Sequence, residues 1–283
     1  MATFFNRATL SYNGGTVNSN VTTGELVEVL SATKTAVTDE YTRGSEVTYV
    51  LNIVNSGSIP FTGLTLTDDL GAYTFNGTTL QPTDYVDGSV KYFIDGVLQP
   101  SPAVTAGPPL SVTGINVPAN GVATVLYAVR VNNLAPPLAG GEITNTAVIG
   151  GGGITDITVT ETVTAEAEPD LSISKSICPS TVTENGQITY TFVIQNSGNT
   201  EAIATDNVVV TDTFDPILSG ITVTYNGTVW TQPESYTYDE ATGLFTTVVG
   251  AITVPAATYT QDPATGNWVV DPGVTVITVT GTV

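Results

Sequence analysis

Hydrophobic and polar residues alternate along much of this chain. In residues 47–53 (VTYVLNI) and 188–194 (ITYTFVI), hydrophobic side chains occupy every second position. A period of two puts alternate side chains on opposite faces of a β-strand. Turn sequences with Asn-Gly, Asn-Ser-Gly or Pro separate these runs, and no long segment has a helical period. The pattern predicts an all-β protein built from sandwich domains.

The second half of the chain repeats the first. GSEVTYVLNIVNSG (44–57) matches GQITYTFVIQNSG (186–198), and TLTDDLG (65–71) matches VVTDTFD (209–215). The flanks of Lys34 (LSATKTA) likewise match those of Lys175 (LSISKSI). The near-constant offset has the length of one compact domain. We therefore predict two tandem Ig-like β-sandwich domains, residues 27–165 and 166–283.

The two copies differ at their ends. The first copy contains ITNTAVI (143–149), which we expect to be its last strand, and the second copy has no counterpart after residue 283. A similar segment, FFNRATL (4–10), stands at the start of the chain. We therefore expect residues 1–26 to be a donor strand with its linker, the linker running from Ser11 to Glu25. Domain two is then an incomplete sandwich that accepts a strand.

Composition narrows the possible functions. Charged residues are 11% of the chain, with 26 Asp and Glu against six Lys and Arg, and there is no His and one Cys. These counts exclude a Ser-His-Asp triad, a His or Cys metal cluster and an internal disulfide framework. A net charge of −20 opposes binding to nucleic acid. We expect no cofactor and no metal, and no membrane insertion, because no apolar run is long enough to span a bilayer.

Side-chain parity puts a lysine, an aspartate and an asparagine on core-facing positions of each copy. In the first copy these residues are Lys34, Asp68 and Asn145; in the second they are Lys175 and Asp212, with Asn6 as the available counterpart of Asn145. Burying an unpaired ammonium or carboxylate costs several kcal/mol, about 3–5 when one partner of a pair is removed. Such a pattern therefore requires an explanation.

One explanation is spontaneous isopeptide bond formation. Burial lowers the pKa of an amine and raises that of a carboxyl group, so a neutral lysine can attack the asparagine carboxamide while a protonated aspartate relays protons. We predict a Lys34–Asn145 bond assisted by Asp68, and a bond from Lys175 to Asn6 of the next subunit assisted by Asp212. The alternative is a buried Lys–Asp salt bridge with the asparagine hydrogen-bonded to the backbone.

The lysine, Thr-Tyr…Asn-Ser-Gly, Thr-Asp and Asn-Thr-Ala strands together resemble the conserved-repeat family of bacterial surface proteins, domain-of-unknown-function family eleven. Two-repeat members without a leader look like the fibre or ribbon proteins of clostridial spore appendages. The resemblance implies an Ig-like sandwich with a structural role on the cell or spore surface. Since Met1 to Leu10 has no signal-peptide pattern, we expect the protein to be made without a signal peptide.

These observations favour a structural subunit that polymerises head to tail with itself. The donor strand would bury Phe4, Ala8 and Leu10 in its neighbour. Cys178 is expected to face outward, where it could make lateral contacts or a disulfide between filaments, or remain a free thiol. A monomeric adhesive or ligand-binding surface protein is the alternative. Enzyme activity beyond the autocatalytic bond is disfavoured, because no pair of acids faces a cleft.

Overall fold

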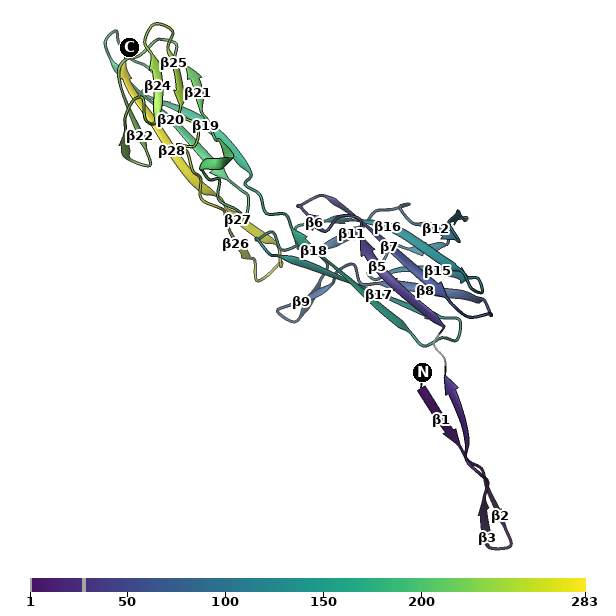
Figure 1. Cartoon of the computed structure of the whole chain (residues 1–283). Helices are drawn as coiled ribbons and strands as arrows, with labels where there is room; N and C mark the ends of the chain where they lie inside the picture. Colours follow the sequence, from purple (N-terminus) through teal and green to yellow (C-terminus); the bar gives the residue numbers. More distant parts are fainter. Residues whose placement is uncertain (1, 27–28) are drawn as a thin grey trace.

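The computed structural model describes residues 2–26 and 29–283 of this 283-residue chain. Two β-sandwich domains lie end to end, and a long hairpin projects from the first domain at the end opposite the second (Figure 1). The strands of domain one run from Leu30 to Ala165, and those of domain two from Leu171 to Thr282. In the described chain the one helical element is a short 3-10 turn, η1 (Ala204–Asp206). The predicted all-β class, with tandem Ig-like sandwiches, is confirmed.

Domain one contains two six-stranded sheets that face each other. The first sheet has the order β13 (Val97–Leu98), β12 (Lys91–Ile94), β16 (Val122–Val131), β7 (Glu46–Asn55) and β5 (Leu30–Ala36), with β11 (Thr83–Tyr85) also beside β16. The second has the order β14 (Ala103–Thr105), β15 (Leu110–Val117), β8 (Phe61–Asp68), β17 (Glu142–Gly151), β18 (Ile157–Ala165) and β6 (Glu40–Tyr41). A separate hairpin is formed by β9 (Tyr73–Phe75) and β10 (Thr78–Leu80).

The core of domain one follows from the alternating sequence. Along β7 every second side chain is buried, and the same alternation holds in β8 and β17. Alternate residues of facing sheets therefore fill the space between them, as in other aligned sandwiches. One continuous hydrophobic cluster results, in which Tyr49, Leu51 and Leu66 are fully buried.

Domain two has one complete sheet and one shorter sheet. The larger sheet has the order β19 (Leu171–Cys178), β20 (Gln187–Asn196), β28 (Gly273–Thr282), β22 (Ser219–Tyr225) and β23 (Thr228–Trp230). The smaller has the order β21 (Thr211–Thr213), β25 (Leu244–Thr247) and β24 (Tyr236–Asp239). A further hairpin, β26 (Thr258–Gln261) with β27 (Trp268–Asp271), extends toward domain one.

The two lysines of the repeat and the order of the strands show which strands of the two domains correspond. β19, β20, β28 and β21 are the counterparts of β5, β7, β16 and β8. Within the described chain, domain two has no counterpart of β17 or of β18. We expected residues 143–149 to be the last strand of domain one, but β18 follows and pairs with them. Domain two therefore lacks two neighbouring strands rather than one.

The N-terminal segment is a two-armed hairpin, which corrects the expected donor strand with linker. β1 (Ala2–Asn6) pairs with β4 (Thr22–Leu26), and β2 (Thr9–Tyr12) pairs with β3 (Gly15–Asn18). Residues 11–25, expected to be a linker, thus supply most of the return arm, and the outgoing arm is interrupted at Arg7 and Ala8. The hairpin contacts neither sandwich core, and its side chains are largely exposed to solvent.

Several hydrogen bonds hold the two domains against each other. The backbone N–H of Trp268 donates to the Asn133 carbonyl at 3.1 Å. Gln261 Nε2 donates to the Tyr73 hydroxyl at 2.7 Å, and Asn199 Nδ2 donates to the Pro137 carbonyl at 3.0 Å. The β26–β27 hairpin of domain two thus braces the junction with domain one.

Candidate cross-linking site

Three sequence-predicted residues meet in the core of domain one. Lys34 lies in β5, Asp68 at the end of β8, and Asn145 in β17. Lys34 Nζ lies 2.7 Å from Asp68 Oδ2, and both side chains are 0% exposed. The same ammonium donates to the backbone carbonyl of Asn145 at 3.0 Å. The strand parity expected from the sequence therefore brings all three residues to one point between the sheets.

Two tyrosines complete the surroundings of this pair. The Tyr127 hydroxyl donates to the same carboxylate oxygen of Asp68 that accepts from Lys34, and the Leu70 N–H donates to the other oxygen at 2.9 Å. Lys34 Nζ lies 4.6 Å from the centre of the Tyr49 ring. Aromatic faces attract a cation but cannot replace its lost water. The site is therefore dry and partly apolar.

Burial changes the ionisation of Lys34. Desolvation lowers the pKa of its ammonium group, and the charge of Asp68 acts in the opposite direction. A lowered pKa increases the fraction of neutral amine, which is the nucleophilic form. The environment therefore favours the reactive state of this lysine.

The side-chain amide of Asn145 is buried without hydrogen-bond partners. Neither Oδ1 nor Nδ2 has a partner among the described residues, although Asn145 as a whole is fully buried. An unsatisfied buried polar group costs about 1–3 kcal/mol. The non-covalent alternative required this amide to bond to the backbone, and it does not. The orphaned amide beside a buried lysine is the feature that the cross-link would remove.

Domain two contains the same pair in an open setting. Lys175 in β19 forms a salt bridge with Asp212 in β21, but these side chains are 38% and 19% exposed. Lys175 Nζ lies 4.3 Å from the centre of the Tyr190 ring and 5.3 Å from that of Phe214. Among the described residues, Asp212 is the hydrogen-bond partner of the Lys175 ammonium, and no asparagine amide bonds to it. Asn6 is on β1, at the far end of the molecule (Figure 1).

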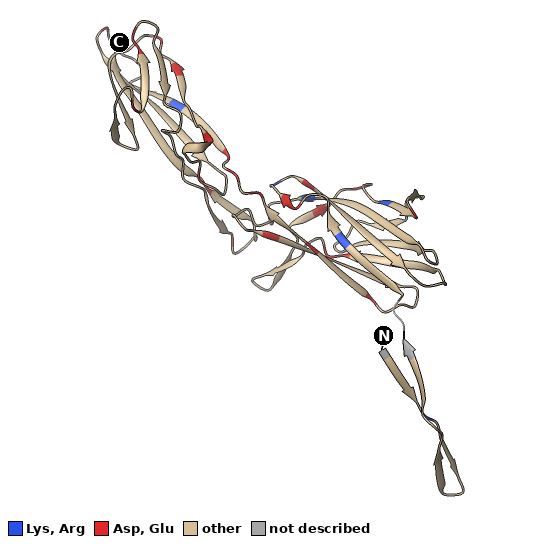
Figure 2. Ribbon diagram, viewed as in Figure 1, with Lys and Arg blue, Asp and Glu red and all other residues tan. Residues whose placement is uncertain are grey.

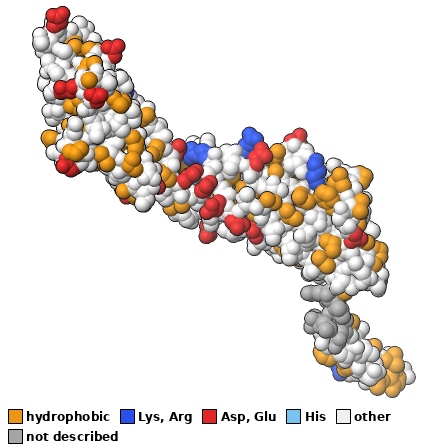
Figure 3. All heavy atoms as spheres, turned by 45° about the horizontal axis from the view of Figure 1, so that its top comes forward, with side chains coloured by type: hydrophobic (Ala, Val, Ile, Leu, Met, Phe, Trp, Pro, Cys, Tyr) orange, Lys and Arg blue, Asp and Glu red, His pale blue; other side chains and the backbone are white. Residues whose placement is uncertain are grey.

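The predicted donor contacts are all on the projecting hairpin. Phe4 is 58% and Leu10 64% exposed, and Ala8 is exposed between β1 and β2. Figure 3 shows hydrophobic side chains gathered on this hairpin. The Phe4 ring lies over Gly24 of the opposite arm, so closely that a Cβ at Gly24 would clash with it. Beyond this contact the hairpin's apolar side chains have little cover.

The remaining predictions from the sequence concern the surface. Cys178 ends β19 and is an exposed free thiol. No group of three or more metal-ligating side chains occurs among residues 2–26 and 29–283. No helix in the described chain has the length and hydrophobicity needed to cross a membrane.

Sequence comparison of the repeats missed the tyrosines of the site. Tyr49 belongs to the repeated Thr-Tyr…Asn-Ser-Gly strand, and strand parity alone places it on the core face. Tyr127 is opposite Tyr49 in β16, but the residue opposite Tyr190 in domain two is Val279. A comparison of the two repeats therefore gives no signal for Tyr127.

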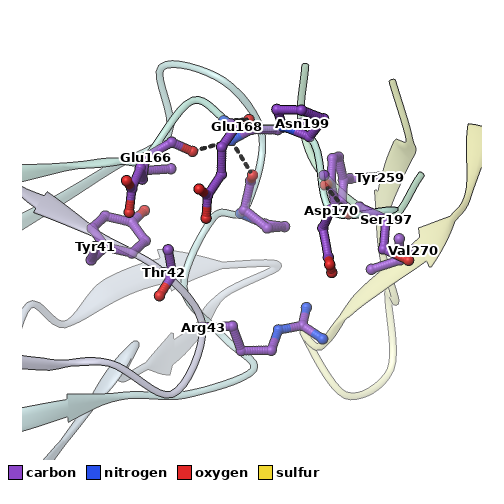
Figure 4. Close-up of a pocket in the computed structure, with 14 residues that line it drawn as sticks. Tyr41, Thr42, Arg43, Glu166, Glu168, Asp170, Ser197, Asn199, Tyr259 and Val270 are labelled. Carbon is purple, nitrogen blue, oxygen red and sulfur yellow. Dashed lines mark hydrogen bonds between the residues drawn. The ribbon is translucent and has the colours of Figure 1, made fainter. Parts of the chain in front are cut away.

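A separate pocket of about 470 Å³ lies at the junction of the domains (Figure 4). Its walls include Tyr41 and Arg43 from domain one, and Asn199 and Tyr259 from domain two. Glu166, Glu168 and Asp170 of the connecting segment also line it and bring negative charge to its surface. Arg43 reaches across the junction to the Trp268 carbonyl at 3.4 Å. None of the lysine, aspartate and asparagine residues of the two lysine sites lines this pocket.

Comparison with known proteins gives a fold resemblance and no family. No family model matches the chain, and no curated protein matches it. Among solved structures, the major pilin subunit BcpA of Bacillus cereus matches with a TM-score of 0.40, 12% identity, and coverage of 95% of this chain and 73% of that one.

Other matches come from further bacterial surface proteins. The pilus backbone protein RrgB from Streptococcus pneumoniae has a TM-score of 0.36 and 12% identity, covering 86% of this chain and 55% of that one. The collagen-binding domain of a Staphylococcus aureus adhesin has a TM-score of 0.31 and 14% identity, covering 50% and 99%. Enzymes also occur among the matched structures. The three pilin and adhesin matches have TM-scores of 0.40 or lower, and similarity at this level assigns no function.

Proposed function

We propose that this protein is the structural subunit of an extracellular or spore-surface fibre, in which the N-terminal hairpin of one subunit completes domain two of the next. The observation that carries the proposal is that the N-terminal hairpin matches the strands that domain two lacks. Within the described chain, domain two has no counterparts of β17 and β18, and residues 2–26 form a hairpin of the same kind. The spore location rests on the family resemblance of the sequence alone.

The register of the two hairpins supports this match. Asn145 in β17 lies opposite Glu161 in β18, and Asn6 in β1 lies opposite Thr22 in β4. Both partners stand sixteen residues after the asparagine. The N-terminal hairpin therefore has the strand order and the reach of the one that completes domain one.

The edge strand that would receive the hairpin is β21, in the smaller sheet of domain two. In domain one β8 pairs with β15 on one side and with β17 on the other, and Ala147 lies opposite Asp68. In domain two β21 pairs only with β25. An unpaired edge is a template for strand addition. With the register of domain one, Ala8 would lie opposite Asp212, and Asn6 would point at Lys175.

Hydrophobic burial favours the same docking. The face of β19 that carries Lys175 also exposes Leu171, Ile173 and Ile177, with Ile173 56% exposed. The corresponding face of β5 is partly or fully buried under β18. Docking would bury this face together with Phe4 and Leu10, and removal of apolar area from water is the main favourable term in association.

Charge does not oppose the docking. Residues 166–283 contain 13 Asp and Glu and a single Lys, whereas residues 1–24 contain Arg7 and no acid. In Figure 2 the N-terminal hairpin is almost free of charged residues, while acids are spread over both domains. A nearly neutral donor avoids the like-charge repulsion that two acidic domains would feel.

Docking of each hairpin on domain two of another subunit would build a chain of subunits. The hairpin and domain two lie at opposite ends of the molecule, so the hairpin cannot fold back onto its own domain two (Figure 1). A head-to-tail contact that does not close on itself produces an open fibre. Inside each subunit the Lys34 amine would join Asn145, and between subunits the Lys175 amine would join Asn6. Each bond releases one ammonia, and every link along the fibre is then covalent.

Deletion of residues 1–26 tests the docking. The truncated protein should remain a soluble subunit under conditions in which the full chain assembles, as seen by negative-stain imaging. Cys178→Ala in the full chain is the matched control and should assemble normally. Fibres of the same form from the truncated protein would refute the proposal.

The second candidate function is a monomeric adhesive or ligand-binding surface protein, and the junction pocket is the observation in its favour. A concave site between two domains, lined by tyrosine, arginine and asparagine side chains, is a usual place for a ligand. Size-exclusion chromatography separates the two candidates. A full-length chain that stays monomeric at high concentration supports the binder.

A further inference from the structure

The hydroxyl of Tyr49 is a buried polar group with no partner among the described residues. Tyr49 lies in the middle of β7, fully buried, with its ring 5.7 Å from that of Tyr127. Buried hydroxyls are normally hydrogen-bonded, and an exception calls for a reason.

Other buried tyrosines of domain one meet this rule. The Tyr92 hydroxyl donates to the Asn116 carbonyl at 2.6 Å, that of Tyr41 donates to the Pro136 carbonyl at 2.7 Å, and that of Tyr127 donates to Asp68. The fold can thus supply partners for tyrosines in this domain. Tyr49 is the exception, and it is the tyrosine beside the lysine.

The asparagine of the same repeated motif, Asn55, has a structural role. Asn55, in the Asn-Ser-Gly turn, donates from Nδ2 to the carbonyls of Ile59 and Pro118 and accepts from the Gly57 N–H. Asn196 makes the same kind of turn contacts in domain two. Turn formation therefore accounts for the asparagine of the motif but leaves its tyrosine without a role.

Tyr49 and Asn145 both lie beside the Lys34 amine. Lys34 Nζ is 3.0 Å from the backbone carbonyl oxygen of Asn145 and 4.6 Å from the centre of the Tyr49 ring. Burial raises the pKa of Tyr49, and the Asn145 side chain acts in the opposite direction. Neither polar atom of the amide is in hydrogen-bonding geometry in this state. A hydroxyl donor and an amide acceptor that both lack partners thus belong to residues that flank the same amine.

We infer that the Tyr49 hydroxyl stabilises the Asn145 carbonyl oxygen during isopeptide formation, and that Tyr190 does the same for Asn6 of the incoming hairpin. The inference rests on the proposed function. Tyr190 occupies the equivalent position in β20, with its ring beside Lys175 Nζ.

Lys34 transfers a proton to Asp68, and the neutral amine attacks Asn145 Cγ to form the new C–N bond. Negative charge develops on Oδ1, where protonated Asp68 and the Tyr49 hydroxyl donate hydrogen bonds. Asp68 then passes a proton to Nδ2 and recovers one from the former lysine nitrogen. The Cγ–Nδ2 bond breaks, ammonia leaves, and a secondary amide remains. A preorganised donor aimed at such an oxyanion needs no reorganisation during the reaction.

Tyr49→Phe tests the inference. The full chain is produced by cell-free synthesis, stopped at intervals, and weighed as intact protein to follow loss of ammonia. Loss of one oxyanion donor slows comparable reactions by about 100-fold or more, so the variant should lose ammonia about 100 times more slowly. Compared in an Asn145→Ala background, where neither protein can form the bond inside domain one, its thermal stability should be equal or higher, because the substitution removes an unpartnered hydroxyl. Tyr92→Phe is the control: it removes a satisfied hydroxyl of the same domain and should leave the reaction rate unchanged.

The results of this experiment distinguish the role of Tyr49 from isopeptide formation itself. If the wild-type chain never loses ammonia, the isopeptide proposal itself fails. If the wild type loses ammonia and Tyr49→Phe does so at the same rate, the role of Tyr49 is refuted. Tyr190→Phe gives an independent check, because it should slow the appearance of covalent multimers and leave the bond inside domain one intact. Equal rates of multimer formation in the wild type and Tyr190→Phe would refute the role of Tyr190.

Discussion

Domain one and domain two contain the same lysine–aspartate pair in two different environments. In domain one the pair is sealed from water, and an asparagine, a tyrosine donor and a second tyrosine surround it. In domain two the lysine is 38% exposed and no asparagine is near. The strands that carry the two lysines, β5 and β19, share the Leu-Ser start and the position of the lysine. What differs is the presence of β17 and β18.

The hairpin that covers the lysine supplies two things at once. It brings the asparagine, and it removes the water that keeps the lysine solvated. A free domain two therefore has neither the electrophile nor the dry site, and both would arrive in a single docking step. Bond formation between subunits is thereby coupled to correct assembly, because a misplaced hairpin would leave Lys175 in water.

The largest expected effect comes from removing one of the two asparagines. Asn6→Ala should convert the ladder of multimers from boiled, reduced fibres into a single monomer band, because no other amide would reach Lys175. Asn145→Ala should keep the ladder and lose only the bond inside domain one. Both results are measured by denaturing gel and by mass spectrometry of tryptic peptides. An unchanged ladder from Asn6→Ala would contradict the assignment of Asn6.

The next effect concerns the two aspartates as ion-pair partners. The reference protein is the subunit that lacks residues 1–26 and carries Asn145→Ala, so that both lysines remain free amines. Asp68→Ala should destabilise domain one by about 3–5 kcal/mol, because it leaves a buried ammonium unpaired. Asp212→Ala should cost less than about 1 kcal/mol, because its partner is solvated. Urea unfolding measures the loss of unfolding free energy in both variants. Equal losses would contradict the description of the Lys34 site as sealed from water and the Lys175 site as open to it.

Chemical labelling compares the exposure of the two lysines directly. In the same reference protein, an amine-acylating reagent should modify Lys175 readily and leave Lys34 unmodified, since Lys34 is 0% exposed. Adding the full-length chain as hairpin donor should protect Lys175. Peptide mapping by mass spectrometry gives the extent at each site. Labelling of Lys175 that is unaffected by the donor would argue against docking at β19.

A smaller effect is expected at alkaline pH. Burial raises the pKa of Tyr41, Tyr49 and Tyr127 in domain one. The unfolded chain therefore loses these protons first as the pH rises past the ordinary tyrosine value of 10.0. Their contribution to stability is complete below that pH and falls as the pH rises through the folded pKa values. Urea unfolding in steps above pH 10.0 should show a decline that is less steep in Tyr127→Phe. An identical decline would exclude Tyr127 as a source.

The sequence predicted much of the fold because alternation is a local property. Side-chain parity in β5, β8 and β17 places Lys34, Asp68 and Asn145 on buried faces, and the structure has them there. The repeat likewise places Lys175 and Asp212 together. None of these inferences requires knowledge of which strands are neighbours.

The sequence-based predictions were wrong for segments that become strands only by pairing with another strand. Residues 157–165 (ITVTETVTA) form a strand because β17 pairs with them along their whole length, although they lead directly into the acidic connecting segment. Residues 15–26 are poor in hydrophobic side chains and lie mostly in the expected linker of residues 11–25, yet they pair with β1 and β2. Polar strands of this kind gain their hydrogen bonds from a neighbour, and their own pattern says little about it.

The environment of each lysine was likewise decided by tertiary structure alone. LSATKTA and LSISKSI encode the same strand with the lysine on the same face, so the sequence by itself determines which way each side chain points. Whether that face is dry depends on strands more than 100 residues away, as with Asn145, which is 111 residues from Lys34. Burial is a property of what packs on a strand. The same local sequence is therefore closed in domain one and open in domain two.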